Sequence, residues 1–167
     1  MGSACARILK QDDLPAVLEI YNHYIMTTTA SFKDEPVSMD ELRGFVFVDH
    51  PRYKSFVVEN GGDIIGFCFL TPYRAHKCYD RTAELGVYLR PEFTRRGLGA
   101  ECVRRLEQSA AETGLKVIVA SISGENVHSI KLFQKLGYEK CAHFKRVGEK
   151  WGRVIDVVFF QKSLKTS

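Results

Sequence analysis

The residues whose types and spacing suggest chemistry lie between Thr82 and Ala100. Within this segment, Arg95-Arg96-Gly97-Leu98-Gly99-Ala100 leads directly into a stretch where apolar residues recur at helical spacing. Glycines at the start of a helix let backbone N–H groups turn inward, and the helix N-terminus adds partial positive charge. The hexapeptide therefore indicates a phosphate or pyrophosphate site, with a plain helix-entry turn as the alternative.

The stretch before this turn carries a carboxylate, Glu84. Apolar and polar residues alternate from Thr82 to Arg90, which is typical of a strand with one face on the core. Glu84 falls on the polar face, which would meet a cavity or solvent. A carboxylate facing a cavity can take a proton from an amine, directly or through water. The alternative is an exposed strand glutamate without a chemical role.

A polar loop over residues 73–81 leads into this strand. It contains Arg74, Ala75, His76 and Lys77, so several basic or potentially basic side chains lie close to Glu84 in sequence. Such a group can bind an anionic substrate. A solvated basic loop is the alternative.

The elements that must position these residues follow from periodicity and turn signals. Asp12 is expected to cap a first helix, which carries an apolar stripe at Val17, Ile20, Tyr21 and Tyr24. We expect further helices over 40–48, after the glycine turn, and over 126–136. Strands are expected at 6–9, 54–60, 64–71, 82–90, 115–122, 138–147 and 153–161, with Asn60-Gly61-Gly62-Asp63 as a hairpin turn.

These elements predict a single α+β or α/β domain over residues 1–167. Its sheet should be mixed and mostly antiparallel, with about seven strands flanked by helices. The chain of 167 residues, 45% hydrophobic and 26% charged, is long enough to bury a core. No apolar run approaches the roughly 20 residues of a membrane span, so no membrane partner is expected. Net charge of +4, spread along the chain, gives no support for a nucleic-acid partner.

Five cysteines are scattered along the chain without a C-x-x-C pair. The odd number and the spacing predict reduced thiols in a cytoplasmic protein, with neither a disulfide framework nor a metal site.

The glycine motif and the order of elements resemble the GNAT superfamily of N-acetyltransferases. Thr94-Arg95-Arg96-Gly97-Leu98-Gly99 fits the family pattern Q/R-x-x-G-x-G/A except at Thr94. Further segments resemble the phosphinothricin (methionine sulfone or sulfoximine) acetyltransferase family, and the resemblance extends over about residues 8–164. These segments are Ile20 to Tyr24, Ser31-Phe32, Glu35-Pro36, Tyr79 to Glu84, and the tail containing Val147-Gly148, Lys150, Gly152-Arg153, Asp156-Val157 and Gln161.

The resemblance implies direct transfer of an acetyl group from acetyl-CoA to a small amino-acid-like amine in a ternary complex. It gives Glu84 the role of base and pairs the backbone of Val87, Tyr88 and Leu89 with the pantetheine arm. It implies a homodimer as well. The remaining cofactor-binding residues that it implies are Arg95, Arg96, Gly97, Leu98, Gly99 and Ala100 at the pyrophosphate, and Asn126, which by itself reads as a helix N-cap.

Substrate recognition is where the sequence departs from the family. The loop usually presents two basic residues, and here they are Arg74 and His76, with Lys77 able to compensate for the missing arginine. Gly86 replaces a small hydroxyl residue, which would widen the pocket or remove a donor. Phe32 matches an aromatic residue of the substrate pocket, with core packing as the alternative. Phe133 replaces a tyrosine that can protonate the leaving thiolate in other enzymes of the superfamily, so no general acid is assigned.

Three other functions remain open. The first is a GNAT enzyme for another amine, such as a polyamine, which the basic loop disfavours, or a protein N-terminus. The second is a non-catalytic CoA-binding module. The third is a nucleotide-binding protein, which is disfavoured because no Walker-type Lys-Ser/Thr pair follows the glycines.

Overall fold

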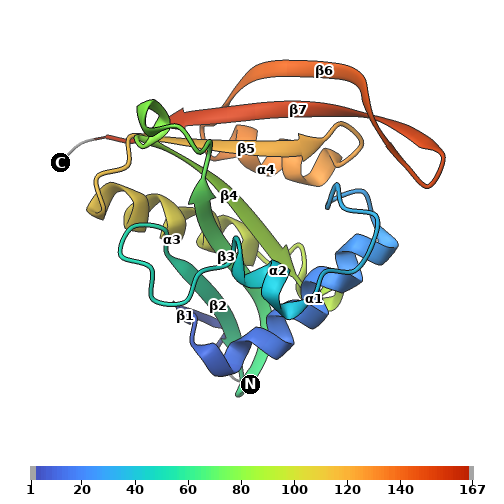
Figure 1. Cartoon of the computed structure of the whole chain (residues 1–167). Coiled ribbons are helices and arrows are strands. Elements are labelled where there is room, and N and C mark those ends of the chain that lie inside the picture. The colour runs from blue at the N-terminus through green and yellow to red at the C-terminus, as the bar shows by residue number, and fades with distance from the viewer. Residues whose placement is uncertain (1–2, 166–167) are drawn as a thin grey trace.

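The computed structural model describes residues 3–165, and within them seven strands form one sheet (Figure 1). Their order is β1-β2-β3-β4-β5-β7-β6, and every described pairing except β4–β5 is antiparallel. The mixed, mostly antiparallel sheet expected from the sequence is therefore confirmed. The strands are β1 (Cys5–Ile8), β2 (Ser55–Asn60), β3 (Asp63–Pro72), β4 (Thr82–Leu89), β5 (Val117–Ser123), β6 (Glu139–Lys150) and β7 (Arg153–Ser163).

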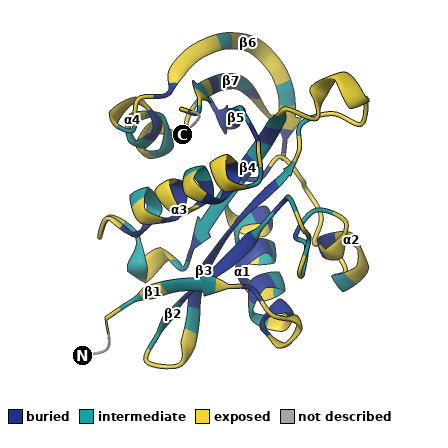
Figure 2. Ribbon diagram, turned by 90° about the vertical axis from the view of Figure 1, so that its left-hand side faces the viewer, coloured by how far each residue is buried: buried dark blue, intermediate teal, exposed yellow. Residues whose placement is uncertain are grey.

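Helices cover both faces of the sheet. They are α1 (Leu14–Thr27), α2 (Met39–Arg43), α3 (Leu98–Glu112) and α4 (Val127–Lys135). One apolar core joins the sheet to α3 and α4, and a second core joins the other face to α1 and α2. Figure 2 shows α1 and α3 on opposite sides of the central strands. Alternation along β4 therefore sends successive side chains toward different helices.

The parallel pair β4–β5 separates after a short distance. Thr82, Ala83 and Glu84 pair with Val117, Ile118 and Val119, and the pairing ends there. Beyond this point β4 stays paired with β3, whereas β5 stays paired with β7. The two strands therefore diverge in the middle of the sheet, with helices on either side of the gap.

Two helical expectations were wrong in detail. A short turn, η1 (Gln11–Asp13), precedes α1, and Asp13 rather than Asp12 accepts the capping bond, from the Lys10 amide at 2.8 Å. The helix expected over 40–48 ends at Arg43, because Gly44 interrupts it and the following residues form turns. The Asn60–Asp63 hairpin is confirmed, since Gly61 and Gly62 adopt φ of 60° and 92°.

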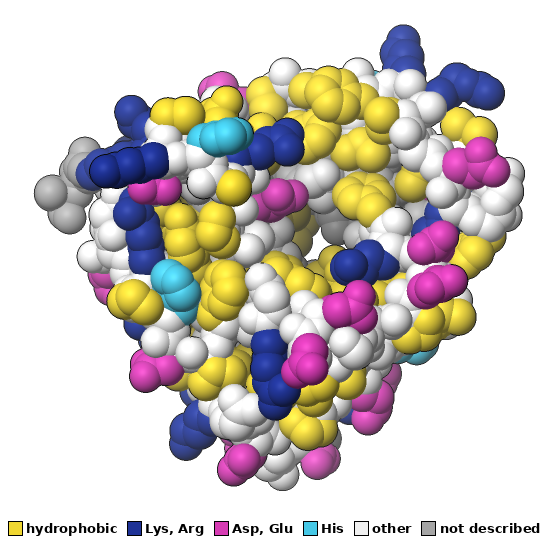
Figure 3. All heavy atoms as spheres, in the orientation of Figure 1, with side chains coloured by type: hydrophobic (Ala, Val, Ile, Leu, Met, Phe, Trp, Pro, Cys, Tyr) yellow, Lys and Arg dark blue, Asp and Glu magenta, His cyan; other side chains and the backbone are white. Residues whose placement is uncertain are grey.

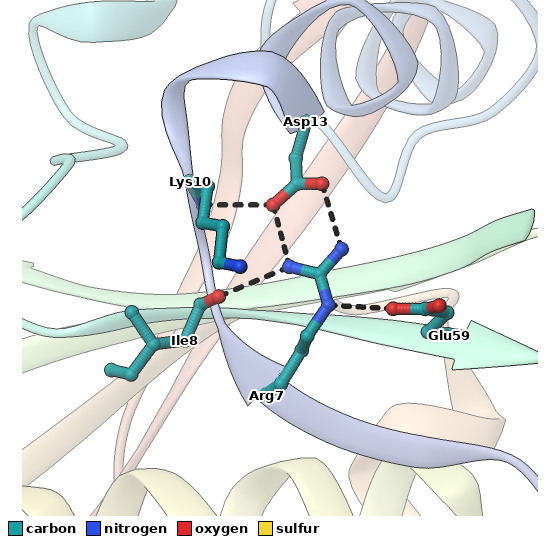
Figure 4. Close-up of polar contacts among 5 residues, drawn as sticks. All are labelled: Arg7, Ile8, Lys10, Asp13 and Glu59. Carbon is teal, nitrogen blue, oxygen red and sulfur yellow. Dashed lines mark hydrogen bonds and ion pairs between the residues drawn. The ribbon is translucent and has the colours of Figure 1, made fainter. Parts of the chain in front are cut away.

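Arg7 ties the edge of the sheet to the start of α1 (Figure 4). Its guanidinium donates to both carboxylate oxygens of Asp13, at 2.8 and 2.9 Å, and to Glu59 on β2 at 2.5 Å. The buried Asp13 carboxylate is thus fully paired. This cluster joins β1, β2 and η1.

The C-terminal strands β6 and β7 form a long hairpin that projects past β5 toward the loop after α1 (Figure 1). Its tip turns through Trp151 and Gly152, both at positive φ. The apolar run from Val157 to Phe160 belongs partly to the core, because Val158 and Phe160 are buried. Across the described residues, no helix has the length and apolar character needed to cross a membrane.

Candidate active site

A cavity of about 510 Å³ opens where β4 and β5 diverge. Its walls come from β4 after Glu84, from the last residues of β5, and from the facing sides of α3 and α4. In Figure 3 the same region appears as a hollow near the middle of the molecular surface. Of the predicted cofactor residues, those that line the cavity are Val87, Tyr88, Leu89, Arg95, Gly97, Gly99, Ala100 and Asn126.

The glycine turn has the backbone conformation of an anion cradle. Arg95 and Gly97 adopt φ of 61° and 83°, and Gly97 is the N-cap of α3. Gly99 brings α3 close to α4, since a Cβ there would lie 3.3 Å from Leu132 Cδ2. The first amides of α3 therefore border the cavity without a side-chain cap.

Two residues of the hexapeptide lie outside this lining. Leu98 is buried in the core beneath the turn, where it fixes the start of α3. The Arg96 guanidinium lies 5.2 Å from the centre of the Phe93 ring. Leu98 is the first residue of α3 and faces the core, whereas Arg96 precedes the N-cap Gly97 and lies outside the helix.

Sequence reasoning missed several polar residues of the same cavity. His128 on α4 approaches Arg95, with 2.6 Å between its Nε2 and the arginine NH2. Arg104 on α3 also lines the cavity, as do Ser121, Ser123 and Ser129. Helical spacing from the glycine turn could have indicated Arg104. The contribution of α4 depends on a packing contact that no local pattern encodes.

One edge of β4 is free beside the cavity. Leu85 to Leu89 pair with β3 on one side, whereas their other side lies beyond the last described β4–β5 pair. The Leu89 carbonyl accepts a hydrogen bond from the Tyr24 hydroxyl of α1. The remaining edge groups can pair with an extended ligand as an added strand would.

Glu84 lies at the point of divergence, directly before the lining begins at Leu85. Ala83 and Leu85 pack toward α3, so Glu84, Gly86 and Tyr88 face α1. The Glu84 carboxyl is half-buried, and this burial raises its pKa above the ordinary value, while the charge of Arg74 lowers the pKa in part. A carboxylate with a raised pKa suits a general base.

A second hollow, of about 440 Å³, lies on the α1 side of the gap. The end of α1 and its following loop form one wall, and Glu125, Asn126 and Arg153 form the other. It shares Tyr24, Ala30 and Asn126 with the first cavity. The two hollows therefore adjoin at these three residues, beside the gap between β4 and β5.

The predicted substrate residues lie at the surface. Arg74, Ala75, His76 and Lys77 are exposed in the β3–β4 connection, and Phe32 is exposed after α1. None of these five described residues lines either hollow. Arg74, whose charge acts on Glu84, packs over Tyr73.

Two expected departures have a structural explanation. Gly86 does not widen a pocket, because the Phe69 ring fills the space in front of it, 2.4 Å from where a Cβ would lie. Phe133 lines the cavity and packs edge-on against Tyr138, with 5.0 Å between the ring centres. Asn126 does cap α4, since its side chain accepts from the Ser129 amide at 3.3 Å.

The five cysteines are free, and Cys68 and Cys102 are buried. Among residues 3–165, no three His, Cys, Asp or Glu side chains gather as metal ligands would.

Comparison with known proteins agrees with this geometry. The model of the acetyltransferase (GNAT) family matches residues 17–138. A methionine sulfoximine/methionine sulfone acetyltransferase of Salmonella typhimurium is 33% identical over 95% of this chain and 93% of its own length. A phosphinothricin N-acetyltransferase of Streptomyces viridochromogenes is 34% identical over 92% of this chain and 84% of its own length.

A solved structure is similar along almost the whole chain. It is a putative acetyltransferase from Salmonella typhimurium with its cofactor acetyl-CoA, and it superimposes with a TM-score of 0.89 at 31% identity. The match covers 99% of this chain and 96% of that one. The protein belongs to the acetyltransferase (GNAT) family.

Proposed function

We propose that the chain acts as a single N-acetyltransferase domain that moves an acetyl group from acetyl-CoA to a small amino-acid-like amine. Acceptors of the phosphinothricin, methionine sulfone or methionine sulfoximine type fit best, since similar proteins are named for them. The observation that carries the proposal is that two hollows adjoin at Tyr24, Ala30 and Asn126, beside the gap between β4 and β5. Cofactor and amine can then reach one point from opposite faces, as direct transfer requires.

The first cavity, which α3 and α4 border, fits acetyl-CoA, which supplies an acetyl thioester when bound. The turn amides from Gly97 onward, with Arg95 beside them, are suited to the pyrophosphate. The edge of Val87, Tyr88 and Leu89, apart from the Leu89 carbonyl that Tyr24 binds, is suited to the amide groups of the pantetheine arm.

Glu84 is the proposed base on the other side of the gap. It accepts the proton of the amine, directly or through water, so that the nitrogen lone pair can attack the thioester carbon. A free N–H of β4 after Glu84 donates to the developing oxyanion. As the C–N bond forms and the C–S bond breaks, the thiolate leaves without an acid, because thiols have a pKa of about 8.5.

The proposal extends to recognition and assembly. Arg74, with His76 and Lys77 in the same exposed loop, would bind the acidic group of the acceptor, and Phe32 would border it. We also propose a homodimer, supported by the exposed apolar residues Phe144, Val147, Trp151 and Val154 on the C-terminal hairpin. The free thiols favour a cytoplasmic location.

The test is release of CoA thiol from acetyl-CoA by the purified protein. The amines are phosphinothricin, methionine sulfone, methionine sulfoximine, ordinary amino acids, a polyamine and an N-terminal peptide. We expect turnover on the first three, with kcat/KM lowered about 10²-fold or more in Glu84→Gln. The variant should bind acetyl-CoA as the wild type does.

Other results would redirect the proposal. Turnover on the peptide or polyamine alone would refute the acceptor class but keep the chemistry. Binding of acetyl-CoA without any turnover would favour a non-catalytic module.

A further inference from the structure

Lys150 is a buried positive charge outside the machinery described above. It ends β6 at the tip of the C-terminal hairpin, and it is only 2% exposed. Its ammonium donates to the Thr28 carbonyl at 2.7 Å and to the Ser31 carbonyl at 2.8 Å, and it lies 4.5 Å from the centre of the Trp151 ring. Residues more than a hundred positions apart are thereby joined.

Burying an ammonium is unfavourable unless the group is well hydrogen-bonded. Desolvation accordingly lowers the pKa of Lys150, and the charge of Asp34 offsets this effect in part. Two carbonyls and an aromatic face compensate for the lost water, but only while the loop holds its observed shape. The contact is therefore a strong constraint on loop conformation.

The constrained segment runs from Thr28 to Ser31, and its first three residues line the second hollow, which we assign to the amine. Ala30 lies between the two clamped carbonyls and borders both hollows. The Thr29 hydroxyl donates to Glu125 at 2.5 Å, and Glu125 pairs with Arg153 at 2.6 Å. Lys150 of the hairpin thus binds the loop through the carbonyls of Thr28 and Ser31, and Glu125, which follows β5, binds it through Thr29.

We infer that Lys150 is a positioning residue for the amine: its ammonium fixes the Thr28–Ser31 loop as the wall against which the acceptor is oriented. The inference rests on the proposed function, and it concerns the acceptor rather than the cofactor. The glycine turn and the free edge of β4 lie on other elements, and among the described residues the Lys150 ammonium makes no hydrogen bond with either of them. Loss of the clamp should therefore weaken amine binding and leave acetyl-CoA binding intact.

The test compares Lys150→Met with a control of similar nature elsewhere, Arg7→Met. Both changes remove a long cation that joins distant elements, but Arg7 lies at the far edge of the sheet. We expect Lys150→Met to raise the amine KM about tenfold or more, with the dissociation constant of acetyl-CoA unchanged within about twofold. Arg7→Met should change neither constant.

Hydrogen–deuterium exchange supplies a readout that does not need turnover. Amides of residues 28–33 should exchange about tenfold faster in Lys150→Met and at the wild-type rate in Arg7→Met. If Lys150→Met does not fold, Lys150→Gln removes the charge while keeping a donor, and the same pattern is expected in weaker form.

Unchanged exchange over residues 28–33, or an unchanged amine KM, would overturn the inference. An equal loss of affinity for amine and acetyl-CoA would also overturn it, since that pattern indicates a general structural role. Failure of the wild type to acetylate any amine would instead refute the proposed function, and the exchange measurement would still decide whether Lys150 orders the loop.

Discussion

At the scale of single residues, Glu84 is set apart by its surroundings. Side chains on either side of it along β4 enter the α3 core, while its own carboxyl is half-buried on the α1 side. Burial favours the neutral acid, and the nearby Arg74 favours the carboxylate. The balance of these two effects sets the pH at which the proposed base is ionised.

Arg74→Met is predicted to move the pH profile of the enzyme. Glu84 must be ionised to accept a proton, so kcat falls as the pH drops through its raised pKa. Removing the Arg74 charge raises that pKa further, and the acid limb of the profile should shift to higher pH. Measuring kcat against pH for both proteins checks this, with saturating amine so that weaker acceptor binding does not interfere. An acid limb at the wild-type position would exclude an influence of Arg74 on the base.

At the scale of elements, the site depends on two strands that start as neighbours and then separate. Strand β4 remains paired with β3, and β5 remains paired with β7. Helix α3 begins immediately beside the gap between β4 and β5. The glycine turn therefore borders the cavity because α3 starts there. Its backbone is left-handed at Gly97, which precedes the first amides of α3. A side chain at Gly97 would project into this space.

Gly97→Ala is predicted to weaken acetyl-CoA binding beyond its effect on stability. Gly114 provides the matched control, because its φ of 85° is nearly that of Gly97 and neither position has an atom within 4 Å of an added Cβ. Each substitution should cost about 1 kcal/mol of unfolding free energy through left-handed strain. Calorimetric titration should show weaker binding of acetyl-CoA in Gly97→Ala and wild-type affinity in Gly114→Ala. Equal affinities would argue against the pyrophosphate assignment.

At the scale of the whole molecule, charged side chains join elements on either side of helix α1. Arg7 joins β1, β2 and the start of α1 at one end, and Lys150 joins the C-terminal hairpin to the end of α1 at the other. Helix α1 is thus fixed at both ends. It presents Tyr24 to the gap between β4 and β5.

Arg7→Met is predicted to destabilise the protein by about 2 kcal/mol at neutral pH, because it leaves the buried Asp13 carboxylate without its main partner. Arg7 lowers the pKa of Asp13, so this stabilisation is present above the unfolded-state value of about 3.9 and is lost as pH falls through the lower folded-state value. Urea unfolding at neutral and acid pH should show the difference between the two proteins shrinking in acid. A constant difference would mean that Arg7 contributes through packing instead.

Much of this architecture could be predicted from local sequence. Alternation in Thr82 to Leu89, the Asn60–Asp63 turn and the glycines before α3 each encode a conformation within a few residues. The sequence by itself determined the strands, the turn before α3, the face of β4 that carries Glu84 and, through resemblance, the family. Local sequence did not distinguish Asp13 from Asp12 as the capping residue, because the two are adjacent and of the same type.

Only the tertiary structure decided which distant residues meet. Three such contacts between separate elements are His128 with Arg95, Phe69 with Gly86, and Lys150 with the Thr28–Ser31 loop. No local pattern encodes them, because they depend on how helices and strands pack once each has formed. The divergence of β4 and β5 is also a tertiary feature. Each strand can be predicted from its own residues, but the gap between them arises because β4 remains paired with β3 and β5 with β7.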